Sequence, residues 1–131
     1  MNRPPIQLID SEADMLANLA ISVEQRLPQV SELLLDEIAR AEVRRAGDIP
    51  RDVVIMGTTV EFVSDSTGQH RTVQLVLPQD EDISNGRISI LTPVGAGLIG
   101  LREGQSIMWP DRGGREHRIS ILRVDQTTVT A

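Results

Sequence analysis

The chain has 131 residues, a length that suits one compact unit or one small core with an appendage. Its thirteen basic residues are all arginine and are outnumbered by nineteen acids, which gives a formal net charge of −6. This balance disfavours nucleic acid as the main partner, because neutralising phosphates requires clustered basic side chains.

Two further features of the composition narrow the possibilities. Phe62 and Trp109 are the only aromatic residues, so we expect an aliphatic core and no aromatic surface for stacking bases. The absence of cysteine excludes a disulfide framework and thiolate chemistry. The N-terminus, MNRPPIQLIDSEADML, resembles neither a signal peptide nor a membrane span, and we expect a soluble cytoplasmic protein that does not bind membranes.

Residues 10–46 have apolar side chains at helical spacing, in two stripes separated at Leu27-Pro28. The residue before a proline avoids helical angles, and a proline is well tolerated in the first turn of a helix. Gly47 occupies the position of a left-handed C-terminal residue. The pattern predicts an antiparallel helical hairpin (a short coiled coil), with arms of about 16–18 residues each. The acids of the second arm, at Glu32, Asp36, Glu37 and Glu42, are expected to face solvent, with Asp36 paired to Arg40.

After Pro50 the apolar period changes to two, which is typical of strands. Strands are predicted over residues 53–56, 58–64, 70–77, 87–91, 105–109 and 115–124, and the tail after residue 124 is expected to fray. The fold class is therefore α+β. We expect a helical hairpin over 1–48 and a small antiparallel sheet domain with one short helix over 49–131.

The short helix lies in LTPVGAGLIGLREGQSIMW, residues 91–109. Thr92 can cap it, and Pro93 occupies a position where a missing N–H is harmless. Gly95 and Gly97 keep the helix thin enough to lie close to the sheet. Taken alone, these features are structural and contain no catalytic group.

The order of elements, together with TPVGAGLIGLREGQ from Thr92 to Gln105, resembles the Gre family of transcript-cleavage factors. Their second domain has an FKBP-like fold and the pattern S-P-[IV]-[AG]-x-[AG]-L-[IL]-G-x-x-x-G-[DQ]. Here Thr92 replaces the usual Ser, and Gln105 the usual Asp. NRPPI and IPRDVVIMGTTVEF make the chain similar to the shorter Rnk subgroup, described as regulators of nucleoside diphosphate kinase. The resemblance covers residues 2–124.

The resemblance implies a protein that docks on RNA polymerase, with the FKBP-like domain on the rim of the secondary channel and the hairpin pointing inward. In the cleavage factors, a longer coiled coil carries two acids that hold a second Mg²⁺ at the catalytic centre. The tip here has one acid, Glu24, followed by Arg26, on short arms. We therefore predict no cleavage activity, and a role as a competitor for the same entrance.

The acidic loop and the Thr-Pro turn are the main candidate binding residues. The resemblance places Asp80, Glu81 and Asp82 together with Thr92 and Pro93 at the polymerase-docking end. The alternative is a solvated loop, and the spacing does not fit a calcium loop. Glu24 and Arg26 at the hairpin tip either contact the channel or are solvated. His70 and His117 have no second ligand nearby in the sequence, so no catalytic, metal or cofactor residue is predicted.

Three other functions remain open from the sequence. A Gre-like factor with residual catalytic effect is one. A peptidyl-prolyl isomerase is a second, disfavoured because its proline pocket needs more aromatic residues than Phe62 and Trp109. Regulation of nucleoside diphosphate kinase is the third, expected through transcription and not through direct contact with the kinase. We expect a monomer.

Overall fold

The computed structural model describes residues 3–65 and 67–129. Within these residues the chain forms three α-helices, α1 (Asp10–Ser22), α2 (Pro28–Arg40) and α3 (Pro93–Leu98). The strands are β1 (Gln7–Ile9), β2 (Glu42–Arg44), β3 (Thr59–Ser64), β4 (His70–Val76), β5 (Arg87–Ser89), β6 (Ser106–Pro110) and β7 (Glu116–Asp125). Single 3₁₀ turns are η1 (Ala46–Asp48), η2 (Pro78–Asp80), η3 (Ile83–Asn85) and η4 (Gln126–Thr128).

The helical hairpin is present, but its arms have 13 residues each. The expectation that the second helix continues to residue 46 is wrong. Residues Glu42–Arg44 instead form β2, which pairs in parallel with β1. β2 is exposed, and its pairing with β1 takes up backbone groups that follow the end of the helix.

The main sheet has the strand order β5-β4-β3-β7-β6 among the described residues. β3 pairs with β4 and β6 pairs with β7, both antiparallel, as the predicted antiparallel sheet requires. The expectation of a wholly antiparallel sheet is wrong at one edge, because β5 runs parallel to β4. The intervening residues 77–86, with η2 and η3, form the crossover that returns the chain to the same end of the sheet. One residue of the predicted turn between β3 and β4, Ser66, lies outside the described residues.

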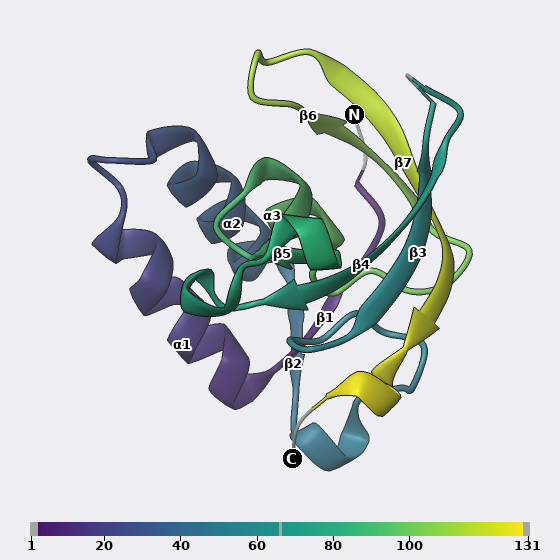
Figure 1. Cartoon of the computed structure of the whole chain (residues 1–131). Helices are drawn as coiled ribbons and strands as arrows, with labels where there is room; N and C mark the ends of the chain where they lie inside the picture. Colours follow the sequence, from purple (N-terminus) through teal and green to yellow (C-terminus); the bar gives the residue numbers. More distant parts are fainter. Residues whose placement is uncertain (1–2, 66, 130–131) are drawn as a thin grey trace.

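The sheet curls around α3, which lies against its concave side (Figure 1). A register shift between Glu61 and Phe62 in β3, opposite β7, adds to the curvature. The thin-helix expectation is confirmed. A Cβ on Gly95 would lie 2.3 Å from the Ser89 carbonyl oxygen, and one on Gly97 would lie 2.8 Å from the Trp109 indole.

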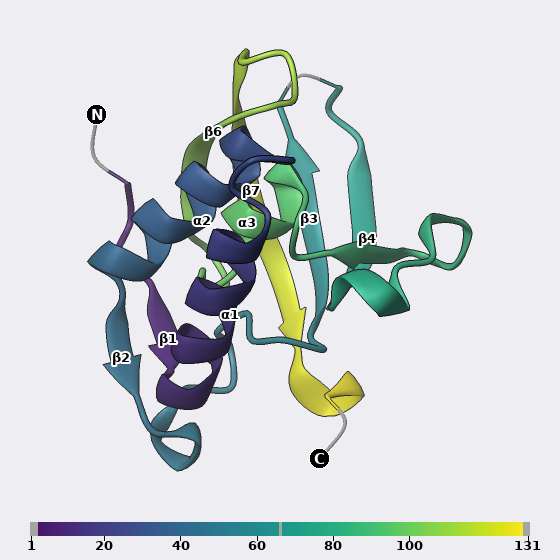
Figure 2. The same cartoon turned by 90° about the vertical axis from the view of Figure 1, so that its left-hand side faces the viewer.

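Helices α1 and α2 lie on the same side as α3, away from the sheet's convex face (Figure 2). One hydrophobic cluster of the described residues contains Leu16 of α1, Leu34 of α2, Leu98 of α3 and Phe62 of β3. The hairpin therefore shares its core with the sheet. None of the helices in the described range has the length and apolarity that crossing a lipid bilayer requires.

The C-terminal tail is ordered over the described residues, so the expectation of fraying after residue 124 is wrong up to Val129. The Gln126 side-chain amide donates to the carbonyl oxygens of Pro50 (2.9 Å) and Val53 (2.7 Å). The Thr128 hydroxyl donates to the Gly57 carbonyl oxygen at 2.6 Å. These bonds fasten the tail to the segment that enters the sheet.

Glu37 corrects the expectation of a wet acidic face on α2. It is buried, with 1% of its surface exposed. Its carboxylate accepts hydrogen bonds from Arg3 (3.1 Å) and from Arg40, which takes the place of the expected Asp36–Arg40 pair. The Arg3 guanidinium also lies 4.6 Å above the Trp109 ring. The cluster ties the N-terminal segment to α2 and to β6.

Candidate functional site

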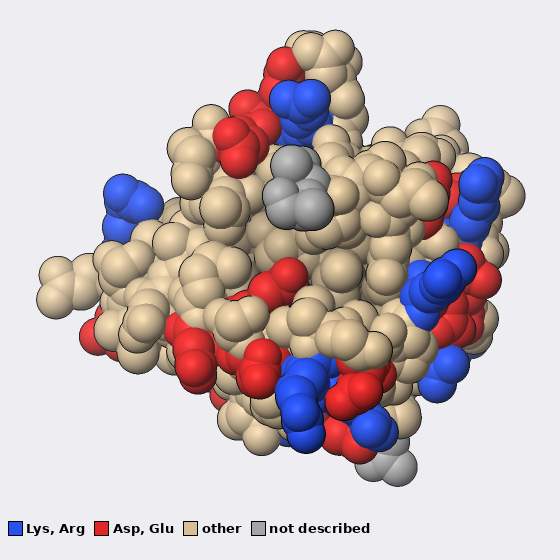
Figure 3. All heavy atoms as spheres, turned by 90° about the horizontal axis from the view of Figure 1, so that it is seen from below, with Lys and Arg blue, Asp and Glu red and all other residues tan. Residues whose placement is uncertain are grey.

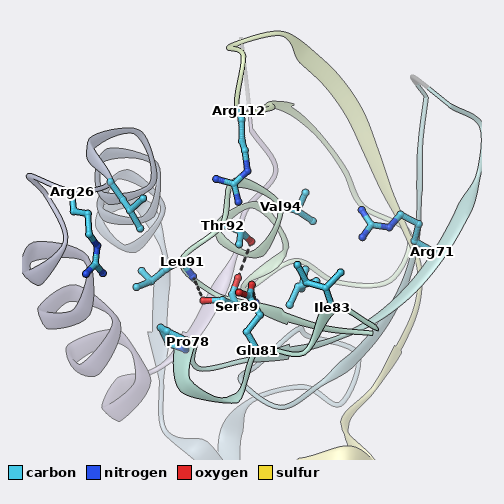
Figure 4. A pocket seen from close by; sticks show the side chains of 12 residues that line it. Arg26, Arg71, Pro78, Glu81, Ile83, Ser89, Leu91, Thr92, Val94 and Arg112 are labelled. Atoms are coloured by element: carbon cyan, nitrogen blue, oxygen red, sulfur yellow. Dashed lines mark hydrogen bonds between the residues drawn. The ribbon is translucent and has the colours of Figure 1, made fainter. Parts of the chain in front are cut away.

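A groove of about 480 Å³ opens where the hairpin tip, the residue 77–86 crossover and α3 meet (Figure 4). This is the size range of typical ligand pockets. Five parts of the chain line it: the turn between α1 and α2, β4, the crossover, the segment from β5 to α3, and the turn between β6 and β7. The lining residues are Arg26, Leu27, Arg71, Pro78, Glu81, Ile83, Ile88, Ser89, Leu91, Thr92, Val94 and Arg112.

The groove has an apolar lining. Ile88 and Leu91 are buried, and Leu27 and Val94 are half-buried against the core. Ile83 is different, because 72% of its surface is exposed. Ile83 thus extends the apolar lining of the groove to the surface.

The Thr92-Pro93 turn is held rigidly at the groove. The Thr92 hydroxyl donates to the Ser89 carbonyl oxygen (2.8 Å) and accepts from the Gly95 N–H (3.0 Å), so it caps α3 as expected. Pro93 is buried, and its carbonyl oxygen accepts from the Trp109 indole N–H at 2.6 Å. Of these two predicted site residues, only Thr92 lines the groove.

The three predicted acids separate in the structure. Glu81 lines the groove, and one of its carboxylate oxygens accepts from the Ser89 N–H at 3.2 Å. Asp80 lines a different hollow, beside Arg87 and Val129. Asp82 is occupied within its own loop, accepting from Asn85 (2.6 Å) and Ser84 (2.8 Å). These side-chain hydrogen bonds, that of Asn85 first, hold the pKa of Asp82 below its ordinary value of 3.8.

Three guanidinium groups surround the groove, and Figure 4 shows them approaching from separate elements. Arg26 belongs to the hairpin tip, Arg71 to β4 and Arg112 to the turn between β6 and β7. Within the described residues, the salt bridges formed by arginines involve Arg3, Arg40, Arg44 and Arg102, and none of the three groove arginines. The guanidinium of Arg71 lies 5.5 Å from the Phe62 ring centroid.

Arg71 and Arg112 were missed by sequence reasoning. The prediction placed Arg112 between the strands over 105–109 and 115–124, and Arg71 within the strand over 70–77, without a binding role for either. The sequence did contain one sign of a binding surface at this place, namely Ile83, an aliphatic residue in an otherwise polar stretch.

The hairpin tip divides its two predicted site residues between different hollows. Arg26 faces the groove, whereas Glu24 lines a hollow beside Glu32 and Asp36 on the outside of α2. The tip is held in place by Gln29, whose side-chain amide donates to the Asp111 carbonyl oxygen at 2.8 Å. Arg112 follows Asp111, so this contact joins the two chain segments that carry Arg26 and Arg112.

The β6–β7 turn is stiffened by Asp111. Its carboxylate accepts from the backbone N–H groups of Gly113 (2.9 Å) and Arg115 (3.0 Å), and its other oxygen lies 2.9 Å from the His117 ring nitrogen. The His117 hydrogen bond is the main reason that the pKa of Asp111 lies below its ordinary value of 3.8. His117 therefore has a structural partner.

Among the described residues, the groove lining contains one carboxylate, from Glu81, and no histidine or aromatic side chain. In the described part of the chain, no three His, Asp or Glu side chains gather as a metal site would require. Phe62 and Trp109 line a smaller hollow of about 200 Å³ beside the groove, but both residues are at least 98% buried. On the face seen from below, acids and arginines lie side by side around the margin, without a continuous basic surface for phosphates (Figure 3).

Comparison with known proteins gives consistent similarities. The family model "Transcription elongation factor, GreA/GreB, C-term" matches residues 49–126. The "Regulator of nucleoside diphosphate kinase" of Escherichia coli strain K12 is 34% identical over 125 residues, covering 95% of this chain and 92% of that protein. The "Transcription elongation factor GreA" of Azorhizobium caulinodans is 33% identical, covering 94% and 84% respectively. A solved GreA/GreB factor from Nitrosomonas europaea has 38% identity and a TM-score of 0.72, covering 94% of this chain and 99% of that one.

Proposed function

The chain belongs to the GreA/GreB family of transcription elongation factors, and on that premise we propose that it regulates transcription by binding RNA polymerase at the secondary channel. The sheet segment is FKBP-like, as the resemblance implies. It docks through the end that carries the crossover acids Asp80, Glu81 and Asp82 and the Thr92-Pro93 turn. The observation that carries this proposal is the groove, because Thr92 of the family motif and Glu81 line it together. A polymerase partner makes the site of action cytoplasmic.

The proposed mode of action is occupancy without transcript cleavage. Cleavage in the family depends on two acids at the end of a long coiled coil, which supply a metal ion to the catalytic centre. Here the arms have 13 residues each, or about 20 Å at 1.5 Å per residue. The tip contributes Glu24 as its acid, with Arg26 facing the groove. A bound monomer would therefore exclude Gre factors from the entrance without replacing their chemistry.

The effect on nucleoside diphosphate kinase implied by one relative's description follows from the same mechanism. A change in transcription alters the amount of kinase without direct contact between the two proteins. Prolyl isomerisation is not favoured, because Phe62 and Trp109 are part of the core and the indole N–H is bonded to Pro93.

Two assays with bacterial core RNA polymerase test the proposal. The first measures binding of the labelled protein to core enzyme and its displacement by a Gre factor. The second measures shortening of nascent RNA in stalled elongation complexes with Mg²⁺. We expect saturable binding, mutual displacement and no shortening above the rate of polymerase alone. A lack of binding rejects the proposal, and shortening that depends on Glu24 restores the residual-cleavage alternative.

A further inference from the structure

We propose that the groove recognises a partner segment carrying carboxylates around a large apolar side chain, and that Arg26, Arg71 and Arg112 are the residues that bind those carboxylates. This inference rests on the proposed function for the identity of the partner. The sequence analysis expected acidic residues to make the contact, whereas this inference assigns it to arginines. Of the three acids of the expected loop, only Glu81 lines the groove, against three arginines.

Charge complementarity is the first step. The protein as a whole is acidic, at −6, yet this groove gathers three guanidinium groups and one carboxylate. That carboxylate, Glu81, already accepts a hydrogen bond from the Ser89 N–H. Arginine presents several donors in a plane that matches a carboxylate, so three such groups around one groove favour an acidic occupant.

The apolar lining is the second step. Ile88, Leu91 and Val94 line the groove between the arginines, and Ile83 is exposed at it. A bare phosphate would leave this surface in water. A protein segment with one buried apolar side chain and flanking acids satisfies both features, as interface hot spots do when a desolvated centre is ringed by polar contacts.

The hairpin tip is the third step, because it makes the site composite. Arg26 and Leu27 come from the α1–α2 turn, and Gln29 bonds this turn to Asp111 beside Arg112. The hairpin therefore forms one wall of the binding site. A partner bound here contacts the hairpin and the sheet segment at the same time.

The test compares two triple variants with the same change in charge. In the first, Arg26, Arg71 and Arg112 are replaced by Gln. In the second, Arg45, Arg51 and Arg118 are replaced by Gln; these are exposed arginines outside the groove lining. All six positions are exposed, and a thermal melt verifies that both variants fold. We expect the groove variant to bind core RNA polymerase at least roughly 100-fold more weakly, on the basis of about tenfold for each charge-assisted bond. The control should stay within about threefold.

Ile83→Asp and Glu81→Gln extend the test in opposite directions. Ile83→Asp introduces a charge like that of the occupant and should weaken binding roughly tenfold or more. Glu81→Gln removes the one acid of the groove lining and should tighten binding a few-fold. If Glu81→Gln weakens binding and the groove triple does not, the acids make the contact and the inference is overturned.

A peptide probe separates this inference from the proposed function. It is an acetylated 12-residue peptide with a central Leu flanked by Glu; the comparison ligands are the same peptide with Gln for Glu, and inorganic tripolyphosphate. If wild-type protein ignores polymerase, the proposed function fails, whereas binding of the Glu peptide that the groove triple abolishes still supports the inference. Equal binding of the Glu and Gln peptides, or binding of tripolyphosphate alone, contradicts it.

Discussion

At the residue scale, α3 packs so closely against its surroundings that two of its positions have no room for a side chain larger than that of glycine. Gly95→Ala places a Cβ against the backbone oxygen of Ser89, and Gly97→Ala places one against the Trp109 ring. We expect Gly95→Ala to lower the free energy of unfolding by about 3 kcal/mol and Gly97→Ala by about 1–3 kcal/mol. Gly47→Ala is the control, because a Cβ at this position has nothing within 4 Å. It should change the free energy of unfolding by less than about 0.5 kcal/mol. Urea unfolding measures all three, and equal effects would contradict the packing account.

Glu37 gives a second prediction at this scale. Glu37→Ala leaves Arg3 and Arg40 without their buried carboxylate, which should cost about 3 kcal/mol. That figure is at the lower end of the usual range because the side chains of both arginines stay about a quarter exposed (29% and 26%). The Trp109 emission should also shift, since Arg3 lies over its ring. Glu32→Ala, an exposed acid on the same helix, is the control, and a similar cost for both variants would rule out the buried cluster as the cause.

The candidate site was only partly predictable from single residues. Glu81, Thr92 and Arg26 were expected from the motif and the tip, and all three line the groove. Arg71 and Arg112 were not, because they lie 41 positions apart and meet only through the curl of the sheet. Glu37 could not be recognised as buried, since the partner that makes its burial tolerable, Arg3, lies far away in the sequence.

At the element scale, local signals predicted most of the strands. Alternating side chains and glycine turns placed 105–109 and 115–124 within one residue of β6 and β7. The predicted strand over 53–56 is wrong, because only Val53 forms a bridge there, to Arg102. The other errors are pairings that leave no local trace. The end of α2 depends on β1, more than thirty residues earlier, and the parallel β4–β5 contact depends on the path of the crossover. The ordered tail likewise depends on Pro50 and Val53.

The contact between α1 and the entry to the sheet makes stability depend on pH. Burial raises the pKa of Glu12 above its ordinary 4.5, opposed by a hydrogen bond from the Met56 N–H. The folded state then binds this proton more tightly than the unfolded state, so Glu12 lowers stability as pH rises from 4.5 through its raised pKa. We expect the stability of Glu12→Gln relative to wild type to increase across that window and then level off. Urea unfolding at a series of pH values measures it, and a pH-independent difference would contradict the account.

Three acids act in the opposite direction at lower pH. Side-chain hydrogen bonds from Asn85, His117 and Thr127 lower the pKa values of Asp82, Asp111 and Asp125 respectively below 3.8. A lowered pKa in the fold gives a contribution to stability that is present above the ordinary value and lost as pH falls through the lowered one. Their loss should appear below pH 3.8, separate from the Glu12 window.

At the scale of the whole molecule, the shared core predicts cooperative unfolding. Leu16 and Leu34 of the hairpin belong to the same cluster as Trp109 of the sheet. Helix content by circular dichroism and Trp109 fluorescence should therefore lose their native values at the same urea concentration. A hairpin that melts first, with native Trp109 emission retained, would show that the two parts are independent.

The central claim is that one end of this molecule, with its groove, rests on RNA polymerase. Site-specific photo-crosslinking from position 83 to core enzyme tests it most directly, because Ile83 is exposed at the groove and a probe there leaves the core intact. We predict a crosslink to polymerase that a Gre factor suppresses, with none from the same probe at exposed position 45. Equal labelling from both positions, or labelling that a Gre factor does not reduce, would contradict the account.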